Sequence, residues 1–291
     1  MGNRISLKRI WQISRIEYYK WIINPRMIVA AAMIIFFWNF AVYPLMELSA
    51  AMNSPLNSLE PFLAVVNSKA LNLITPAVYL FLISDYPRLD RNGLFSLQRV
   101  RKREWVIGQF LFFIYSAFSF LLVLFLFMLL PNAKNSFVAD GWSLVVTQYG
   151  IFFPERAASF AATLITKELY NQIAPFEAAA VAFILNLFYL TLLAMILLLF
   201  YTFNAKKVGV TVAAGIIAFG SALGMIKSSG MWIFPMAHTM VSLHFTDYFR
   251  KPIMPLKTSF LYFVCAIVVL LVVSLLAIKH TNFLNIDDNG A

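Results

Sequence analysis

Three side chains in the second half of the chain have the types and the spacing of metal ligands. His238, His244 and Asp247 lie close together in the sequence, and imidazole and carboxylate groups are common ligands of zinc. The segment around them, residues 231–245, is otherwise apolar and aromatic. We therefore expect the three groups to be polar groups at an interface, we expect no metal site, and we expect loss of either histidine to be mild.

The motifs of common catalytic and nucleotide-binding sites are missing from the sequence. No glycine is followed by lysine, which excludes a phosphate-binding loop of the GxxxxGK[ST] type. Neither HExxH nor GxSxG occurs. The single cysteine, Cys265, excludes an intrachain disulfide and is expected to be a small packing residue. We therefore expect no enzyme activity and no cofactor in this chain by itself.

The composition predicts an integral membrane protein. The chain is 61% hydrophobic and 12% charged, far from the usual balance of a soluble domain. A bilayer is crossed by ~20 apolar residues in a helix. Five uncharged runs of sufficient length are found, at residues 27–46, 106–130, 178–203, 208–226 and 258–278. A sixth, weaker span is expected at residues 66–84, where Lys69 can reach the surface and Pro76 interrupts the run.

The positions of the basic residues predict the orientation. If the N-terminus lies inside, the inner connections hold 15 Lys and Arg residues and the outer connections hold 8. Inner loops of membrane proteins carry the excess of positive charge, so both termini are expected in the cytoplasm, at a bacterial cell (plasma) membrane. This bias and the attraction to anionic membrane lipid account for the net charge of +10. No nucleic-acid partner is expected.

The N-terminal residues 1–26 are expected to form an amphipathic helix on the inner membrane surface. Apolar and basic side chains interleave at helical spacing from residue 4 to residue 23, and Asn24 and Pro25 end the pattern. A disordered basic tail is the alternative, which the two tryptophans and six isoleucines of this segment disfavour. The first apolar run is too long for a signal-peptide core, so no cleaved leader is expected.

The connection at residues 85–104 is strongly basic and lies between two apolar runs. After Pro87, several apolar residues supply one side of a short amphipathic helix. We interpret the segment as a docking element for a cytoplasmic partner. The residues expected to make this contact are Arg88, Arg91, Leu94, Phe95, Leu97, Arg99 and Arg101.

Two long connections, residues 131–176 and 227–257, are expected outside the cell. In the first, apolar residues recur at helical spacing between Ala157 and Leu169, which predicts an amphipathic helix. The apolar stretch at residues 142–153 is too short to cross and is expected to be a partly buried cover. Each connection is too long to be a plain turn.

The second outer connection is expected to enter the membrane and return. Its apolar core is broken by prolines, and such a segment is stable in a bilayer where protein or a wet cavity covers its backbone. We predict two short re-entrant helices that meet near residues 242–247, with an outer gate formed by Trp232, Phe234, Pro235 and Phe245. The alternative is a surface loop whose aromatic residues lie at headgroup level.

The expected spans offer few polar groups for transport chemistry. They contain Asn39, Asn72 and Asn186 but no ionisable residue near mid-membrane, which disfavours an ion-coupled carrier. Gly220 and Gly224 form a GxxxG pattern that is either a helix contact face or a chance match.

This layout resembles the permease subunits of type-2 ATP-binding cassette (ABC) exporters. The most specific piece is Gly93 followed by residues 101–109, similar to the family's glycine, basic stretch, aromatic residue and glycine that open the third span. The resemblance implies an all-α membrane protein with one permease domain over residues 1–291: six transmembrane helices, an N-terminal amphipathic interface helix, and re-entrant outer helices between spans 5 and 6. It also implies that residues 88–100 are a coupling helix in a groove of a separate ATPase subunit.

The resemblance further implies a complex of two permease subunits, identical or homologous, with a cytoplasmic ATPase dimer that binds ATP and Mg. The expected function is export of an amphiphilic peptide, lipid or drug-like substrate, as in antimicrobial peptide resistance. The alternative is a membrane sensor or immunity subunit that binds an antimicrobial peptide or lipid without transporting it. A third possibility, an intramembrane enzyme, lacks a candidate catalytic pair.

Overall fold

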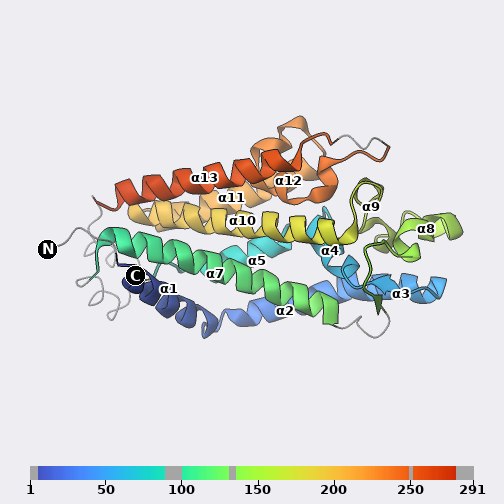
Figure 1. The fold of residues 1–291 in the computed structure, drawn as a ribbon, viewed down its shortest axis with the longest axis horizontal. Coiled ribbons are helices and arrows are strands. Elements are labelled where there is room, and N and C mark those ends of the chain that lie inside the picture. The colour runs from blue at the N-terminus through green and yellow to red at the C-terminus, as the bar shows by residue number, and fades with distance from the viewer. Residues whose placement is uncertain (1–5, 89–99, 131–135, 249–251, 280–291) are drawn as a thin grey trace.

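The computed structural model describes residues 6–88, 100–130, 136–248 and 252–279, and its regular structure is almost entirely helical (Figure 1). The longer elements are α1 (Leu7–Ile22), α2 (Met27–Phe37), the π-helical turn η1 (Trp38–Val42), α3 (Tyr43–Met52), α4 (Glu60–Asn67), α5 (Ile74–Ile83), α7 (Lys102–Leu129), α8 (Leu144–Phe152), α10 (Pro175–Thr202), α11 (Lys206–Met225) and α13 (Leu256–Ala277). The short elements are α9 (Lys167–Tyr170), α12 (Pro235–Thr239), the 3₁₀ turns η3 (Pro154–Arg156), η4 (Ala161–Thr163), η5 (Ser229–Ile233) and η6 (Val241–His244), and the strands β1 (Leu56–Asn57) and β2 (Ser136–Phe137).

Five of the described helices are long and apolar enough to cross a membrane, as the sequence predicted for an all-α, multi-pass membrane protein. They are the continuous rod of α2, η1 and α3 (Met27–Met52), α7, α10, α11 and α13. The rod and the other long helices run along the length of an elongated bundle (Figure 1). We call its two ends the α1 end and the α8 end.

The expected span at residues 66–84 differs from the structure. Only α5 is an apolar helix there, and its 10 residues cover ~15 Å, which is less than the ~30 Å of hydrocarbon. Residues 69–73 form turns instead. Pro76 explains the break: it occupies the first turn of α5, where its missing N–H leaves no helical hydrogen bond unmade, and it opposes a helix that continues from α4.

Helix α10 is the core of the bundle. In its most apolar stretch 67% of the residues are buried, against 17% for α13. The exposed side of α13 includes Cys265, so the expectation that this cysteine packs inside the protein is wrong. Because α13 keeps most of its apolar side chains outside the bundle, this face is available to lipid or to a partner.

The connection at residues 131–176 contains less helix than its periodicity predicted. The apolar stretch near residue 142 does form α8, but residues 157–169 are divided among short turns and the start of α9. Thr166 has an extended backbone, which interrupts any helix between Ala157 and Leu169. Leu164, Ile165 and Leu169 are nevertheless buried, whereas Ala157 and Phe160 of the same pattern are exposed. The pattern therefore gave the correct burial only in its second half and did not give the backbone structure.

A buried carboxylate joins α4 to the segment before α8. Glu60 accepts hydrogen bonds from the backbone N–H of Ser143 (2.7 Å) and of Asn57 (3.0 Å). Asn57 lies in β1, which pairs in parallel with β2, and its amide donates to the carbonyl of Gly141 (2.8 Å). Burial raises the pKa of Glu60 to about 7, because the desolvation outweighs the hydrogen bonds that favour the charged form.

Glu60 is expected to make stability depend on pH. Its folded pKa lies above its ordinary value, so its contribution is complete below the ordinary pKa of about 4.3 and is lost as the pH rises through about 7. Between these limits the free energy of unfolding falls by about 4 kcal/mol. We expect the Tm in detergent to fall from about pH 5 to about pH 7 and to level off above that, and the fall to be smaller in Glu60→Gln, which does not ionise.

A matched control for this measurement is Glu47→Gln, which removes an exposed carboxylate from α3. Each variant is compared by the slope of its Tm against pH. A constant loss of stability caused by the amide does not change this slope. Equal slopes for the unmodified chain and Glu60→Gln would show that Glu60 does not titrate in this range.

Candidate functional site

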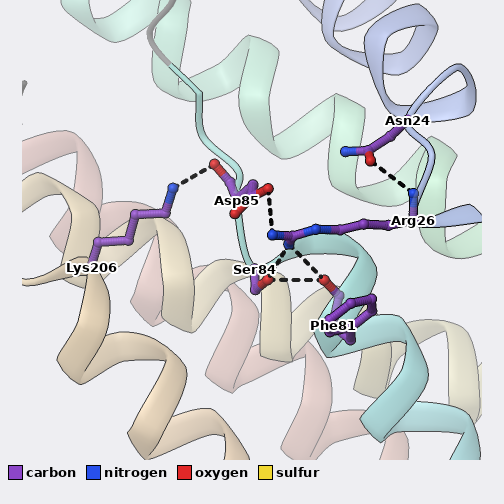
Figure 2. Close-up of polar contacts among 6 residues, drawn as sticks. All are labelled: Asn24, Arg26, Phe81, Ser84, Asp85 and Lys206. Atoms are coloured by element: carbon purple, nitrogen blue, oxygen red, sulfur yellow. Dashed lines mark hydrogen bonds and ion pairs between the residues drawn. The ribbon is translucent and has the colours of Figure 1, made fainter. Parts of the chain in front are cut away.

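The chain enters the basic connection through a cluster of polar contacts at the α1 end (Figure 2). Asp85 follows the last turn of α5, and its carboxylate lies 2.9 Å from the guanidinium of Arg26. The same guanidinium donates to the hydroxyl of Ser84 (2.9 Å) and to the carbonyl of Phe81 (3.3 Å). It also lies over the Phe81 ring, 5.0 Å from its centre. Arg26 therefore makes four contacts with residues at the C-terminal end of α5 and directly after it.

Two further residues connect this cluster to other helices. The side-chain Oδ1 of Asn24 accepts from the backbone N–H of Arg26 (3.0 Å) in the bend between α1 and α2, a local turn that orients the arginine. From the start of α11, Lys206 donates to the backbone carbonyl of Asp85 (2.5 Å). Figure 2 shows Arg26 and Lys206 approaching Asp85 from opposite sides. The chain at Asp85 is thus held by α2, α5 and α11 together.

The chain leaves the basic connection through a second polar cluster. Glu104, in the first turn of α7, has a completely buried side chain. Its carboxylate accepts from the backbone N–H of Ser6 (2.9 Å) and of Arg101 (3.4 Å), and it lies 3.5 Å from the guanidinium of Arg9. A negative group at a helix N-terminus is also favoured by the helix dipole. Nearby, Lys102 donates to the carbonyl of Lys279 after α13 (3.3 Å).

Close packing of α1 on α7 adds to this cluster. At Gly108 a Cβ atom would lie only 2.8 Å from the side chain of Ile13, so only glycine fits at this crossing. The face of α1 that packs inside the protein includes Ile10 and Trp21 together with Ser14 and Glu17, whereas Trp11 is exposed. The N-terminal helix expected from the sequence is present at Leu7–Ile22.

The structure describes only the edges of the predicted docking element. Arg88 and Arg101 are exposed. The other predicted contact residues, Arg91, Leu94, Phe95, Leu97 and Arg99, lie outside the described residues. The polar anchors at Arg26, Asp85, Lys206 and Glu104 were not predicted, although acidic residues at both edges of a strongly basic segment were a signal for them.

At the α8 end, the hairpin of residues 228–248 contains three short helices, η5, α12 and η6, where the sequence predicted two that meet near residues 242–247. Of the predicted gate residues, Pro235 is buried at the start of α12, and Trp232, Phe234 and Phe245 are half-buried. Gly220 of α11 lies against this hairpin, because a Cβ atom there would be 3.1 Å from Met236. Nothing lies within 4 Å of the Cβ position of Gly224. The GxxxG pattern is therefore a contact face at one glycine only.

The two histidines of the hairpin are internal and not interfacial, contrary to our expectation. His238 and His244 are 2% and 0% exposed. The ring of His238 bonds the hydroxyl of Ser259 (2.7 Å) and the carbonyl of Trp232 (2.8 Å), and it stacks on Tyr262 at 4.2 Å. Burial lowers the pKa of both histidines, so both are neutral at pH 7.

The ring of His244 closes the hairpin onto the chain before α13. It bonds the carbonyl of Met254 (2.8 Å) and lies 3.3 Å from the carbonyl of His238. A neutral ring has a single N–H, and the shorter contact assigns it to the nitrogen that faces Met254. Asp247 does not join these histidines: within the described residues, no group of three or more His, Cys, Asp or Glu side chains is arranged to hold a metal.

Comparison with family models, curated proteins and solved structures finds no match to this chain. Its function must therefore be argued from its own geometry. The α1 end, where two polar clusters bracket a basic connection, is the candidate site.

Proposed function

We propose that the chain is the permease subunit of an ABC exporter and that the basic connection is its contact with a separate ATPase. The observation that carries this proposal is the bracketing of residues 86–100. Asp85 is held on one side by Arg26 and Lys206, and Glu104 is held on the other by Ser6 and Arg9. A displacement of the connection would therefore pull on α1, α2, α5, α7 and α11 at once.

This arrangement suits a coupling element better than a passive loop. A passive loop needs no fixed contacts at its two ends, whereas a segment that transmits motion must be firmly attached to the helices that move. The positive charge of the connection and of α1 supports a cytoplasmic α1 end. In this arrangement α5, with the turn before it, is the second of six spans, and the 228–248 hairpin is re-entrant, where its broken backbone would be covered by α10, α11 and α13.

The transported substrate is proposed to be amphiphilic. The described spans carry no ion pair at mid-bundle of the kind expected in a proton-coupled carrier. ATP and Mg would be bound by the ATPase partner, and a second permease subunit would complete the path. The exposed apolar side of α13 is a suitable surface for that subunit or for lipid.

The coupling proposal is tested with two kinds of variant in the complex purified from its own membrane. Phe95→Asp with Leu97→Asp should remove the ATPase, because loss of central apolar anchors weakens an interface by about 2 kcal/mol or more each. Asp85→Asn should keep the ATPase bound but lower its vanadate-sensitive activity to about a tenth. The variant loses the ion pair that fixes one end of the connection, while the surface that contacts the ATPase is unchanged.

The matched control for the docking variant is Asn92→Asp with Gln98→Asp, which adds the same charge to the same segment and removes no apolar group. Retention of the ATPase by the Phe95 and Leu97 variant would overturn the docking proposal. Such a result would favour the alternative, a sensor or immunity subunit, for which the ligand-sized cavities at the α8 end are the supporting feature.

A further inference from the structure

A cavity of about 640 Å³ opens among the short elements at the α8 end. One wall is apolar and is made by α3, α8 and the segment before α9, with Leu45, Leu48, Val145, Tyr149 and Ile165 among its residues. All five of these side chains are buried. Ligand cavities in proteins have this size, and the apolar wall leaves room for an alkyl chain beside polar lining residues such as Asn171 and Asp247.

A second cavity of about 290 Å³ adjoins the first and has a different lining. The two share Thr163, Thr166 and Glu168. Only the smaller one is lined by Lys69 and Lys227. Glu168 is paired with Lys227 at 2.7 Å, whereas no ion pair of Lys69 occurs in the described part of the chain. The smaller cavity therefore carries one uncompensated positive charge.

An unused hydrogen-bond donor lies in the wall of the smaller cavity. Asn67, at the end of α4, is 3% exposed, and its Oδ1 accepts from the backbone N–H of Ser242 (3.3 Å). This bond orients the amide and leaves Nδ2 as a buried donor with no partner among the described residues. A buried donor without an acceptor is costly, and a ligand oxygen beside Lys69 would satisfy it.

We propose that the two joined cavities bind an anionic amphiphile. Its phosphate or carboxylate group lies beside Asn67, Lys69 and Lys227, where an amide N–H and an ammonium group donate to its oxygens. Its alkyl chain lies along the apolar wall of the larger cavity. This binding site goes beyond the proposed function, because an exporter and a sensor could both contain it. Its test needs neither transport nor an ATPase.

The test measures binding of three probes to the purified chain in detergent by native mass spectrometry. Lauroyl lysophosphatidic acid has both a phosphate and a chain, lauroyl lysophosphatidylcholine has a neutral head, and glycerol 3-phosphate has no chain. We expect one molecule of the first to bind with a Kd about tenfold or more below those of the other two. Equal affinity for the neutral head would overturn the proposal, and binding of glycerol 3-phosphate at the same affinity would assign the site to a soluble phosphate instead.

Variants then place the probe in the two cavities. Lys69→Gln should weaken binding of lauroyl lysophosphatidic acid about fivefold to tenfold, because an ionised donor is lost, and Lys69→Arg should restore most of it. Lys257→Gln removes an exposed lysine outside both cavities and should have no effect. Ala161→Trp should fill part of the larger cavity and weaken the lysolipid only. A loss equal to that of Lys69→Gln in the Lys257 variant would show attraction to the whole surface and contradict the site.

Discussion

Replacement of Glu104 by alanine is expected to free α1 from α7. The carboxylate is completely buried and serves the backbone N–H groups of Ser6 and Arg101 together with the guanidinium of Arg9. Arg9 is 49% exposed and can return to water, so most of the cost comes from the two N–H groups. Both hydrogen bonds are partly buried, and each group left without a partner costs ~1–3 kcal/mol, which gives a loss of about 2–6 kcal/mol at this contact.

Limited trypsin digestion measures this release, because Lys8, Arg9 and Arg15 are cleavage sites within α1. Cleavage requires local opening of the helix, so its rate should rise about tenfold or more in Glu104→Ala. The matched control is Glu177→Ala, which removes an exposed glutamate from the same third position of α10. Equal cleavage rates in the two variants would contradict the role of Glu104 as an anchor.

Replacement of His238 by alanine is expected to open the 228–248 hairpin. The variant loses bonds to Ser259 and to the carbonyl of Trp232, as well as the stacking on Tyr262. Together with the cavity that remains, these losses predict a cost of about 2–4 kcal/mol. This reverses the expectation from sequence that changes at the histidines are mild, because that expectation placed them at an interface.

The opening of the hairpin can be measured by the reactivity of a cysteine introduced at a buried position. In a Cys265→Ser background, Ala237→Cys places a thiol at a position that is 1% exposed, and its reaction with N-ethylmaleimide should be slow. Adding His238→Ala should raise the rate about tenfold or more. Adding Tyr248→Ala, at an 88% exposed position in the same hairpin, should leave the rate unchanged. If both additions change the rate equally, His238 does not hold the hairpin closed.

Length and hydropathy were sufficient to predict five spans, because each long apolar helix is specified within its own residues. The expected span at residues 66–84 contains a shorter helix than predicted, because a proline at position 76 marks the start of a helix as well as a break within one. The binding partners of the polar anchors at the α1 end could not be predicted for another reason. Their partners are far apart in sequence: Ser6 and Glu104 are separated by 98 residues, and no local pattern reports such a contact.

The burial of the two histidines within the hairpin could also not be predicted from the sequence. An aromatic segment with two histidines has the composition of a headgroup-level anchor and of a packed element alike. What decides between them is the hydroxyl of Ser259 and the ring of Tyr262, both supplied by α13. The periodicity near Leu164 gave correct burial and incorrect backbone for a related reason, since apolar spacing reports the side that is covered and Thr166 decides whether the helix continues.

The contact between Glu60 and Ser143 has a consequence for biosynthesis. The two residues are 83 positions apart, so at ~5–20 residues per second the ribosome needs about 4–17 seconds to supply the partner. During this interval α4 has already been made, with its carboxyl group and the paired N–H of Asn57 still lacking the strand and helix that cover them. During synthesis the polar segment around Asn57 and Glu60 therefore lies between the first apolar helices without its partners. We expect the membrane insertion machinery to hold this segment until α7 and β2 have been made.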